Sequence, residues 1–313
     1  MNILIAEPEN YSHTAIEMYA TVGNVVQLPD LNVPLEAVIA HFEVVVLRLG
    51  YVIDKGMLQK ASKLRYIISP TTGLDHIDEV AAAEKGISII SLRGEASFLS
   101  AIPSTAEFTW TLLLALLKRL PDAVQHVIEG GWNRNLYKGN NVKGKKIGIL
   151  GLGRVGKQVG GYALAFGMEV MAYDTDPSQL MSGIKMAATP EELFSWSQIL
   201  CIHIPALNND GYISANLLQL LSLGAFVINT SRGSVWDEAA VATLLQNHHL
   251  GGVATDVLGG EMNEVTRKSN PLLSIAGKLP NLIITPHIAG ATFESMAATE
   301  DFVSRKFMAI VSK

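Results

Sequence analysis

The feature that most restricts the fold of this chain is a repeated alternation between short runs rich in Val and Ile and longer amphipathic segments. Such alternation is typical of βα units, whose strands pair into parallel sheets. Runs such as Val44-Val45-Val46-Leu47 contain no alternating polar residues, so we expect helices on both faces of each sheet. The pattern predicts strands near residues 3–6, 25–28, 44–47, 66–69 and 87–90, and a second series near 146–150, 169–173, 199–204, 225–229, 252–255 and 282–285.

Two successive series of strands in 313 residues predict an α/β protein with two doubly wound domains. A helix predicted to begin at Ser104, with Ser104 and Glu107 as a capping box, marks the seam between them. The segment 291–313 has helical apolar spacing, and we expect it to cross back to the first domain. The predicted domains are therefore residues 1–101 completed by 291–313, and residues 102–290.

The composition indicates which binding partners and which cellular compartment to expect for this protein. The formal net charge of −5 does not favour a nucleic-acid or anionic-membrane partner. A single cysteine, Cys201, argues against a disulfide framework and fits a reducing compartment. The longest apolar run, residues 112–117, is far shorter than the roughly 20 residues that span a bilayer. Because the sequence at residues 1–5 also lacks the pattern of a signal peptide, we expect a cytoplasmic protein with no membrane partner.

A glycine-rich loop follows the predicted strand at 146–150. In the pattern Gly-x-Gly-x-x-Gly, Gly151 permits a tight turn, Gly153 lets a pyrophosphate approach the backbone, and Gly156 lets helix and strand pack closely. Asp174 ends the next strand, where it would accept hydrogen bonds from ribose hydroxyls and repel a 2′-phosphate. The segment predicts a dinucleotide site that prefers NAD over NADP. The alternative is a tight βα turn followed by an incidental surface aspartate.

Three ionisable side chains follow later strands of the second series, where open α/β sheets bind ligands. Arg232 offers a planar charged fork for a carboxylate and a carbonyl oxygen. His287 can donate a proton near neutral pH, and Glu261 would favour the charged imidazole and fix its tautomer. These groups match the reduction of a 2-keto acid. Taken singly, each has a simpler interpretation as a surface charge, a loop carboxylate or a core histidine.

These motifs resemble the D-isomer-specific 2-hydroxyacid dehydrogenases over essentially the whole chain. The resemblance implies a Rossmann NAD-binding domain and a flavodoxin-like substrate domain separated by a cleft, and a homodimer joined through the NAD-binding domains. It also implies catalytic roles for Arg232, Glu261 and His287, and no metal. The motifs that carry the resemblance are Gly73-Leu74-Asp75-His76-Ile77-Asp78, Ser104-Thr105-Ala106-Glu107, the glycine loop, His203-Ile204-Pro205, Asn229-Thr230-Ser231-Arg232-Gly233, Asp256 with Glu261, and Pro286-His287-Ile288-Ala289-Gly290.

The resemblance further implies which residues meet the ligands. NAD contacts would lie at Arg154, Val155, Thr230 and Asp256, with His203 and Pro205 near the pyrophosphate. Backbone amides near Thr72 and Gly73 would bind the substrate carboxylate. Arg48 is either a contact for the distal end of the substrate or a solvated loop arginine.

The implied function is an NAD-dependent oxidoreductase that interconverts a small 2-keto acid and its D-2-hydroxy acid, with His287 as the acid/base. Leu258-Gly259-Gly260 stands where the family usually has a proline-containing loop, so the shape of the loop before Glu261 stays open. The alternative is an NAD(H)-sensing corepressor or binding protein. The residues do not specify which 2-hydroxy acid is used.

Overall fold

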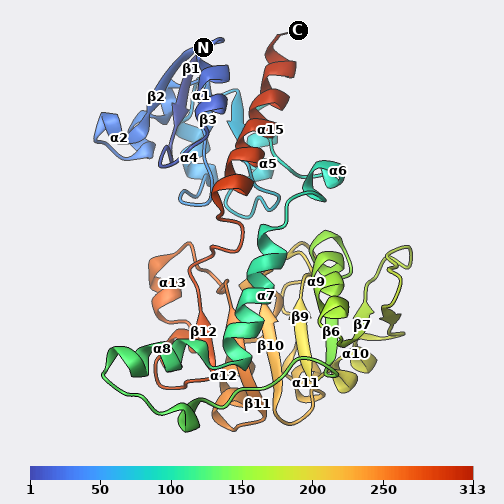
Figure 1. Ribbon diagram of the computed structural model, residues 1–313. Helices are drawn as coiled ribbons and strands as arrows, with labels where there is room; N and C mark the ends of the chain where they lie inside the picture. Colours follow the sequence, from blue (N-terminus) through green and yellow to red (C-terminus); the bar gives the residue numbers. More distant parts are fainter. Residues whose placement is uncertain (313) are drawn as a thin grey trace. The chain divides into compact units, whose positions relative to one another are not determined.

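The computed structural model describes residues 1–312, and Lys313, the last residue of the predicted segment 291–313, lies outside this range. The described chain divides into two compact units (Figure 1). Unit 1 comprises Met1–Ile102 together with the chain from Ala291 onward, and unit 2 comprises Pro103–Gly290.

Unit 1 contains, within the described residues, a parallel five-stranded sheet in the order β2-β1-β3-β4-β5. This is the flavodoxin-like order, as the family resemblance implies. The side chains of Val44, Val45 and Val46 are all fully buried, which explains why their run lacks polar residues. The strands are β1 (Asn2–Ile5), β2 (Asn24–Gln27), β3 (Val44–Val46), β4 (Tyr66–Ile68) and β5 (Ser88–Ile90).

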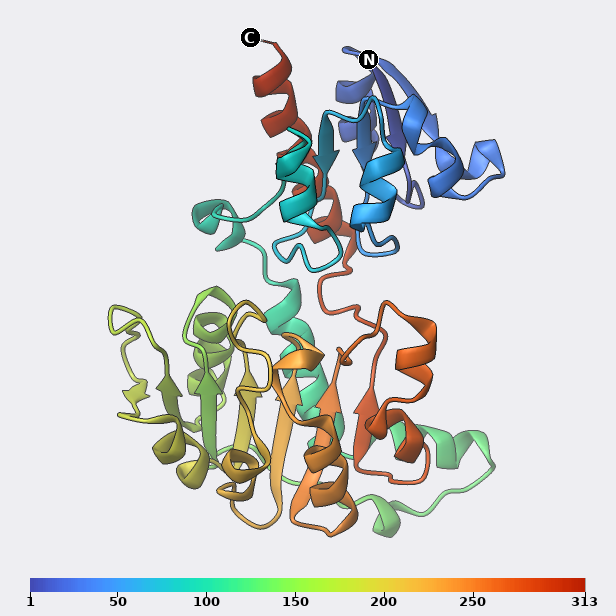
Figure 2. The ribbon, with the colours of Figure 1, turned by 180° about the vertical axis from the view of Figure 1, so that it is seen from behind.

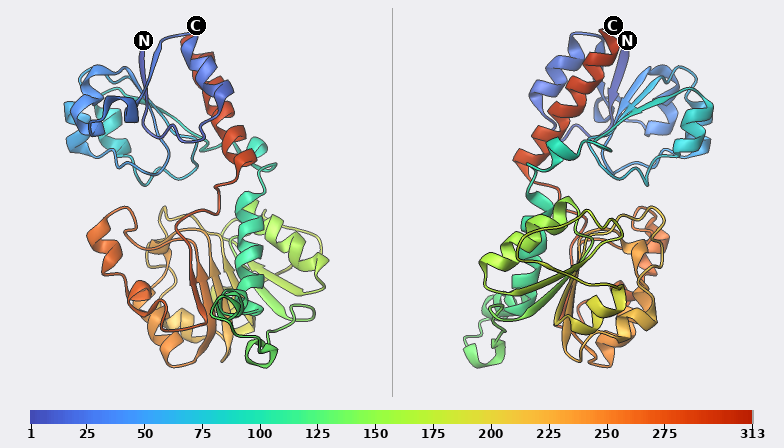
Figure 3. Two further views of the ribbon diagram at one scale, coloured as in Figure 1. Left: turned by 60° about the vertical axis from the view of Figure 1, so that its left-hand side comes forward. Right: turned by 90° about the vertical axis from the view of Figure 1, so that its right-hand side faces the viewer.

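Helices cover both faces of this sheet. The last helix, α15, packs beside α1, and both views of Figure 3 show the two together. Phe307 of α15 is fully buried and makes edge-to-face ring contacts with Tyr19 at 6.0 Å and Tyr66 at 5.4 Å between centroids. The end of the chain therefore supplies part of the core of unit 1. The helices are α1 (His13–Ala20), α6 (Ala96–Leu99) and α15 (Phe293–Val311) on this face, and α2 (Leu28–Leu31), α3 (Leu35–Val38), η1 (Ile39–His41), α4 (Lys55–Lys60) and α5 (Glu79–Glu84) elsewhere.

Unit 2 contains, in the part of the chain described, a parallel seven-stranded sheet in the order β12-β11-β10-β9-β6-β7-β8. Read from β8, this is the Rossmann order extended by one strand. The two doubly wound domains predicted from the sequence are thus confirmed. The prediction of six strands here is wrong, because it missed β8, which has only two residues. The strands are β6 (Lys146–Leu150), β7 (Glu169–Tyr173), β8 (Lys185–Met186), β9 (Ile199–Ile202), β10 (Ala225–Asn229), β11 (Leu250–Thr255) and β12 (Leu282–Ile284).

Two helical layers enclose the sheet of unit 2, and Figure 2 shows the layer opposite to α7. The stretch Ala96–Leu117 is long and apolar enough to cross a membrane by length and composition alone. However, this stretch consists of two separate helices, α6 and α7, and α7 buries Leu112, Leu113 and Leu116 in the core of unit 2. The helices are α7 (Ser104–Leu117) and α9 (Arg154–Ala165) on one face, α10 (Pro190–Trp196), α11 (Ala215–Gln219), α12 (Glu238–Gln246) and α14 (Pro271–Ile275) on the other, and α8 (Leu120–Ile128), η2 (Arg134–Tyr137), η3 (Gly233–Val235) and α13 (Glu264–Lys268) in connections.

The predicted capping box at the start of α7 is wrong. Pro103 is the N-cap residue, and Ser104 already lies in the first turn, where its side chain is buried. A side chain caps a helix only from an extended residue that precedes the first turn. Ser104 therefore contributes to packing rather than to capping.

Candidate active site

The candidate catalytic residues lie on three loops that leave neighbouring strands of unit 2. In the sheet register, Asn229 of β10 is paired with Thr255 of β11, and Thr255 with Ile284 of β12. Because the strands are parallel, the loops that follow them begin at the same edge of the sheet. These loops carry Arg232, Glu261 and His287 in turn.

Glu261 and His287 are joined directly. The Nδ1 atom of His287 is hydrogen-bonded to Oε1 of Glu261, and the two side chains are 25% and 21% exposed. Since an ionised carboxylate only accepts hydrogen bonds, Nδ1 is the donor, and Nε2 is left for another partner. The second oxygen of Glu261 accepts a hydrogen bond from the backbone N–H of Leu258 at 2.9 Å. The unusual loop before Glu261 therefore still presents the carboxylate to the imidazole.

A buried aspartate fixes the backbone around His287. His287 has φ of 56°, a left-handed conformation that is strained for a non-glycine residue. Its N–H donates to the Asp256 carbonyl at 2.9 Å, while the Asp256 carboxylate accepts the N–H groups of Ile288 at 3.0 Å and Ala289 at 2.7 Å. Burial raises the pKa of Asp256, and these hydrogen bonds, with one from Thr285, oppose that rise. Asp256, predicted as an NAD contact, here holds the turn that presents His287.

The loop of Arg232 is in backbone contact with the loop of Glu261. Asn229 donates from Nδ2 to the Arg232 carbonyl at 3.0 Å, and Arg232 donates from Nη1 to the Ser231 carbonyl at 2.8 Å. A Cβ atom on Gly233 would lie 2.0 Å from the carbonyl carbon of Leu258, so only glycine permits this approach. The structure thus brings Glu261 and His287 together, and it packs Gly233, next to Arg232, against Leu258 in the loop that leads to Glu261.

The glycine loop lies where the strand order reverses, between β6 and β9. Gly151 has φ of 93°, and a Cβ atom there would lie 2.7 Å from the His203 carbonyl oxygen. A Cβ atom on Gly156 would lie 2.1 Å from the Gly151 carbonyl oxygen. A Cβ atom on Gly153, in contrast, would meet no other atom of the described residues within 4 Å. Two of the glycines are therefore needed for packing, and the middle one borders open space.

Two polar side chains near this loop fit a bound dinucleotide. The carboxylate of Asp174 accepts the N–H of Leu152 at 2.7 Å and the N–H of Asp176 at 2.9 Å, which leaves acceptor positions for ribose hydroxyls. His203 has a buried Nε2 atom that lacks a hydrogen-bond partner among residues 1–312. Burial and the charge of Arg154 lower the pKa of His203 to about 3, so the ring is neutral. A neutral imidazole beside an open loop suits contact with a ligand.

The other predicted cofactor contacts lie around the same loop. Arg154 and Val155 are half-buried in the first turn of α9, and Pro205 is exposed two residues after His203. The hydroxyl of Thr230 is hydrogen-bonded to that of Thr109 in α7 at 2.7 Å.

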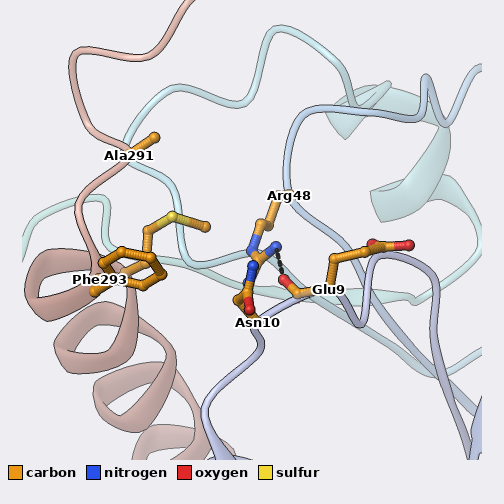
Figure 4. A pocket seen from close by; sticks show the side chains of 6 residues that line it. Glu9, Asn10, Arg48, Ala291 and Phe293 are labelled. Carbon is orange, nitrogen blue, oxygen red and sulfur yellow. Dashed lines mark hydrogen bonds between the residues drawn. The ribbon is translucent and has the colours of Figure 1, made fainter.

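The candidate substrate contacts lie in unit 1. Thr72 is exposed, and the carbonyl of Gly73 accepts a hydrogen bond from the Thr71 hydroxyl at 2.8 Å. The guanidinium of Arg48 donates from Nε and Nη2 to Oε1 of Glu300, at 2.8 and 2.5 Å. Its Nη1 atom donates to the backbone carbonyl of Glu9 at 3.0 Å (Figure 4). Arg48 also borders a pocket of about 300 Å³ within unit 1. The pocket is lined by Glu9, Asn10, Arg48, Ala291, Phe293 and Met296.

Comparison with known proteins gives the same assignment as the motifs. The family model described as "D-isomer specific 2-hydroxyacid dehydrogenase, NAD binding domain" matches residues 110–289. The chain belongs to this family. The resemblance inferred from the motifs and the use of NAD are thereby confirmed.

Several members of the family are similar over most of this chain. The D-3-phosphoglycerate dehydrogenase of Methanocaldococcus jannaschii is 31% identical over 316 residues, which cover 99% of this chain and 57% of that protein. The hydroxypyruvate reductase of Thermotoga maritima is 30% identical over 264 residues, covering 83% of this chain and 82% of that one. The solved D-lactate dehydrogenase of Aquifex aeolicus, complexed with NAD and lactic acid, superposes with a TM-score of 0.83 at 25% identity and covers 100% of this chain and 96% of its own.

This chain spans only about half the length of the phosphoglycerate dehydrogenases that it matches, for example 57% of the protein from Methanocaldococcus jannaschii.

Among residues 1–312, no three His, Cys, Asp or Glu side chains are grouped to hold a metal ion.

Sequence reasoning missed one carboxylate near the loops that carry the candidate catalytic residues. Glu238, the first residue of α12, accepts a hydrogen bond from the N–H of Gly259 at 2.9 Å. In the sequence, Asp237-Glu238 has the pattern of an ordinary helix N-terminus, in which acidic residues complement the helix dipole. Only the fold shows that Glu238 reaches the Glu261 loop.

Proposed function

We propose that this protein is an NAD-dependent oxidoreductase that interconverts a small 2-keto acid and its D-2-hydroxy acid. The observation that carries the proposal is the hydrogen bond between Glu261 and His287, on the carboxyl edge of the same sheet that carries the glycine loop. Family membership supports the same reaction. When bound, NADH supplies the hydride that adds to the carbonyl carbon of the substrate.

His287 is the proposed acid in reduction and the proposed base in oxidation. Because Nδ1 faces Glu261, the proton is exchanged with the substrate oxygen at Nε2. In reduction, the Nε2–H of the imidazolium protonates the carbonyl oxygen as the carbon gains the hydride, and neutral His287 with an Nδ1–H remains. The Glu261 carboxylate keeps the ring oriented through the hydrogen bond to Nδ1, before and after the transfer.

Arg232 is the proposed group that binds the substrate carboxylate and polarises its carbonyl oxygen. Its guanidinium keeps its charge at all working pH values and offers donors in a planar fork. The neighbouring Asn229 fixes the backbone of this loop through the Arg232 carbonyl. The backbone near Thr72 and Gly73 is proposed to bind the same carboxylate, in the role that the family resemblance implies.

We propose Arg48 as a contact for an uncharged distal group rather than for a phosphate. Its charge is balanced by Glu300, and its remaining contact is with the backbone carbonyl of Glu9. A doubly charged phosphate would therefore find no uncompensated positive charge at Arg48. Phe293 and Met296 line the same pocket with apolar surface. We expect kcat/KM to be higher for hydroxypyruvate than for its phosphorylated analogue, and the opposite order would contradict this role.

A homodimer joined through unit 2 is also proposed. Helix α8 stands out from the sheet in Figures 1 and 2, and its residues are all half-buried or exposed. Leu120, Val124, Val127 and Ile128 share the helical spacing of one face and are exposed, as is Trp132 beyond the helix, at 90%. An apolar stripe of this kind is typical of a surface covered by another chain. A second copy is the occupant that the family resemblance favours.

We further propose a cytoplasmic location and a small-molecule substrate, without a nucleic-acid or membrane partner. The single cysteine, Cys201, is buried as a free thiol in the core of unit 2, as expected in a reducing compartment.

The proposal is tested with a panel of glyoxylate, pyruvate, hydroxypyruvate, phosphohydroxypyruvate and larger 2-keto acids, each with NADH. We expect oxidation of NADH with at least one of them. For that substrate, His287→Asn and Arg232→Ala should each lower kcat about 10²–10⁴-fold while NADH affinity stays within about twofold. Turnover that survives both substitutions would refute the mechanism. NADH binding without turnover on any 2-keto acid would favour the NAD(H)-sensing alternative.

A further inference from the structure

The carboxylate of Glu238 accepts a hydrogen bond on each of its two oxygens. Its Oε1 atom receives the N–H of Gly259 at 2.9 Å, and its Oε2 atom receives Nδ2 of Asn270 at 2.6 Å. The orientation of the Asn270 amide is set independently, because its Oδ1 atom accepts the N–H of Leu272 at 2.9 Å. Both donors point at Glu238. Burial raises the pKa of Glu238, and these two hydrogen bonds oppose that rise by favouring the ionised carboxylate.

The carboxylate of Glu238 lies close to the backbone of Gly259, which has no side chain of its own. A Cβ atom on Gly259 would lie 2.9 Å from Oε2 of Glu238. The carboxylate thus lies directly against the backbone of the loop, and a larger residue at position 259 would displace it.

Successive contacts connect Gly259 with Glu261 and His287. The residue before it, Leu258, donates its N–H to one oxygen of Glu261, and the other oxygen of Glu261 faces Nδ1 of His287. Leu258 is also the residue against which Gly233, next to Arg232, is packed. Glu238 therefore holds the loop one residue away from the backbone group that anchors Glu261.

We propose that Glu238 is a positioning residue for the reaction: through Gly259 it fixes the loop Leu258–Glu261 and so holds Glu261 against His287. This inference rests on the proposed function. Glu238 has no direct contact with the imidazole among the interactions of the described residues, so it acts through the loop. Loosening the loop weakens the interaction of Glu261 with protonated His287 and misaligns the proton donor.

The test compares Glu238→Gln with Glu264→Gln. Glutamine has nearly the shape of glutamate, but its amide would direct N–H groups at the donor from Gly259 or from Asn270. Glu264 is the matched control, since it is also the first residue of a helix, α13, and its exposed side chain pairs with Lys268. Both substitutions remove one negative charge at a helix N-terminus. Of the two residues, Glu238 accepts the hydrogen bond from Gly259, and its charge also acts on Glu261, an effect that the variant Glu238→Asp leaves in place.

We expect Glu238→Gln to lower kcat about tenfold to a hundredfold, as for a catalytic group displaced by about 1 Å, with NADH affinity unchanged. The alkaline limb of the pH profile for keto-acid reduction, where the proton donor loses its proton, should move to lower pH. Glu264→Gln should match the wild type. A purely structural role would lower thermal stability without moving the pH limb, and wild-type kcat with an unmoved limb in Glu238→Gln would overturn the inference.

A second measurement does not depend on turnover. Diethyl pyrocarbonate reacts with neutral imidazole, and peptide mass spectrometry reports the rate at His287 alone. We expect faster modification of His287 in Glu238→Gln than in the wild type at the same pH, and no change in Glu264→Gln. Equal rates in all three proteins would overturn the inference even if the wild type reduces keto acids. If the wild type reduces no keto acid but the rates differ as expected, the proposed function fails and the link between Glu238 and His287 stands.

If Glu238→Gln fails to fold, Glu238→Asp replaces it in both measurements. Aspartate keeps the charge and accepts hydrogen bonds only, but it is one methylene shorter. We expect an intermediate loss of kcat and a smaller shift of the pH limb in the same direction. Wild-type behaviour of Glu238→Asp in both measurements would also overturn the inference.

Discussion

Replacing Arg48 by methionine should destabilise unit 1 strongly at neutral pH. Arg48 donates two hydrogen bonds to one oxygen of Glu300, and the other oxygen of Glu300 accepts the N–H of Ser12 at 2.7 Å. The Glu300 side chain is only 1% exposed and that of Arg48 is 15% exposed. The substitution therefore leaves a carboxylate buried beside a single backbone donor.

The size of the loss follows from this burial. Removing one partner of a buried ion pair costs about 3–5 kcal/mol, because the remaining charge is uncompensated. Burial raises the pKa of Glu300 in the folded protein, and Arg48 opposes that rise. Without Arg48 the folded-state pKa rises further above the unfolded value. Stability is then regained as the pH falls and Glu300 takes up a proton, so the loss should be smaller at about pH 5 than at about pH 7.5.

A double variant separates packing from substrate binding. Glu300→Gln removes the buried charge but keeps an oxygen for the N–H of Ser12, so Arg48→Met with Glu300→Gln should recover most of the stability. Urea denaturation followed by circular dichroism gives the free energies of unfolding. A loss below about 1 kcal/mol for Arg48→Met at pH 7.5, or the absence of rescue, would refute the reasoning. In the stable double variant, a raised KM for the keto acid would support substrate contact by Arg48, and an unchanged KM would reduce Arg48 to a structural role.

Three further outcomes follow from the geometry of unit 2. Gly153→Ala should leave the melting temperature unchanged and weaken NADH binding in calorimetry, whereas Gly156→Ala should lower the melting temperature, because its Cβ atom would lie 2.1 Å from the Gly151 carbonyl oxygen. Asp174→Ala should weaken NADH binding about tenfold and leave NADPH binding unchanged or stronger, and a parallel loss for both cofactors would argue against ribose contact. Val124→Asp, on the exposed face of α8, should yield a monomer in analytical ultracentrifugation if that face joins two copies.

The sequence predicted the architecture well because the strands are buried on both faces. A run such as that of β3 has only apolar side chains, so its position can be read without knowing its neighbours. β8, with only Lys185 and Met186, lacks such a run, since its pairing with β7 is set by the chain around it. The prediction of the capping box failed for a related reason. Pro103 already has helical backbone angles, so the helix begins one residue earlier than the Ser-x-x-Glu pattern predicts. The sequence pattern alone does not reveal which residue before a helix has an extended backbone.

The candidate site was predictable in its residue types but not in how its carboxylates are used. The loop carrying Glu261 departs from the family pattern, and the sequence could not tell whether its carboxylate still faces His287. Its geometry depends on Glu238, which lies on another helix and whose contacts are set by packing. Contacts between distant segments leave no local signal in one sequence.

The two aspartates that the sequence assigned to the cofactor illustrate the limit of motif reading. A carboxylate has about four acceptor positions. Asp174 uses two of them on the backbone of Leu152 and Asp176, so it can also bind ribose hydroxyls. Asp256 uses three, on the hydroxyl of Thr285 and two N–H groups of the turn after His287, and is buried. The same residue type at the end of a strand therefore suits direct contact with the cofactor at Asp174, but at Asp256 it acts mainly by holding the imidazole in place.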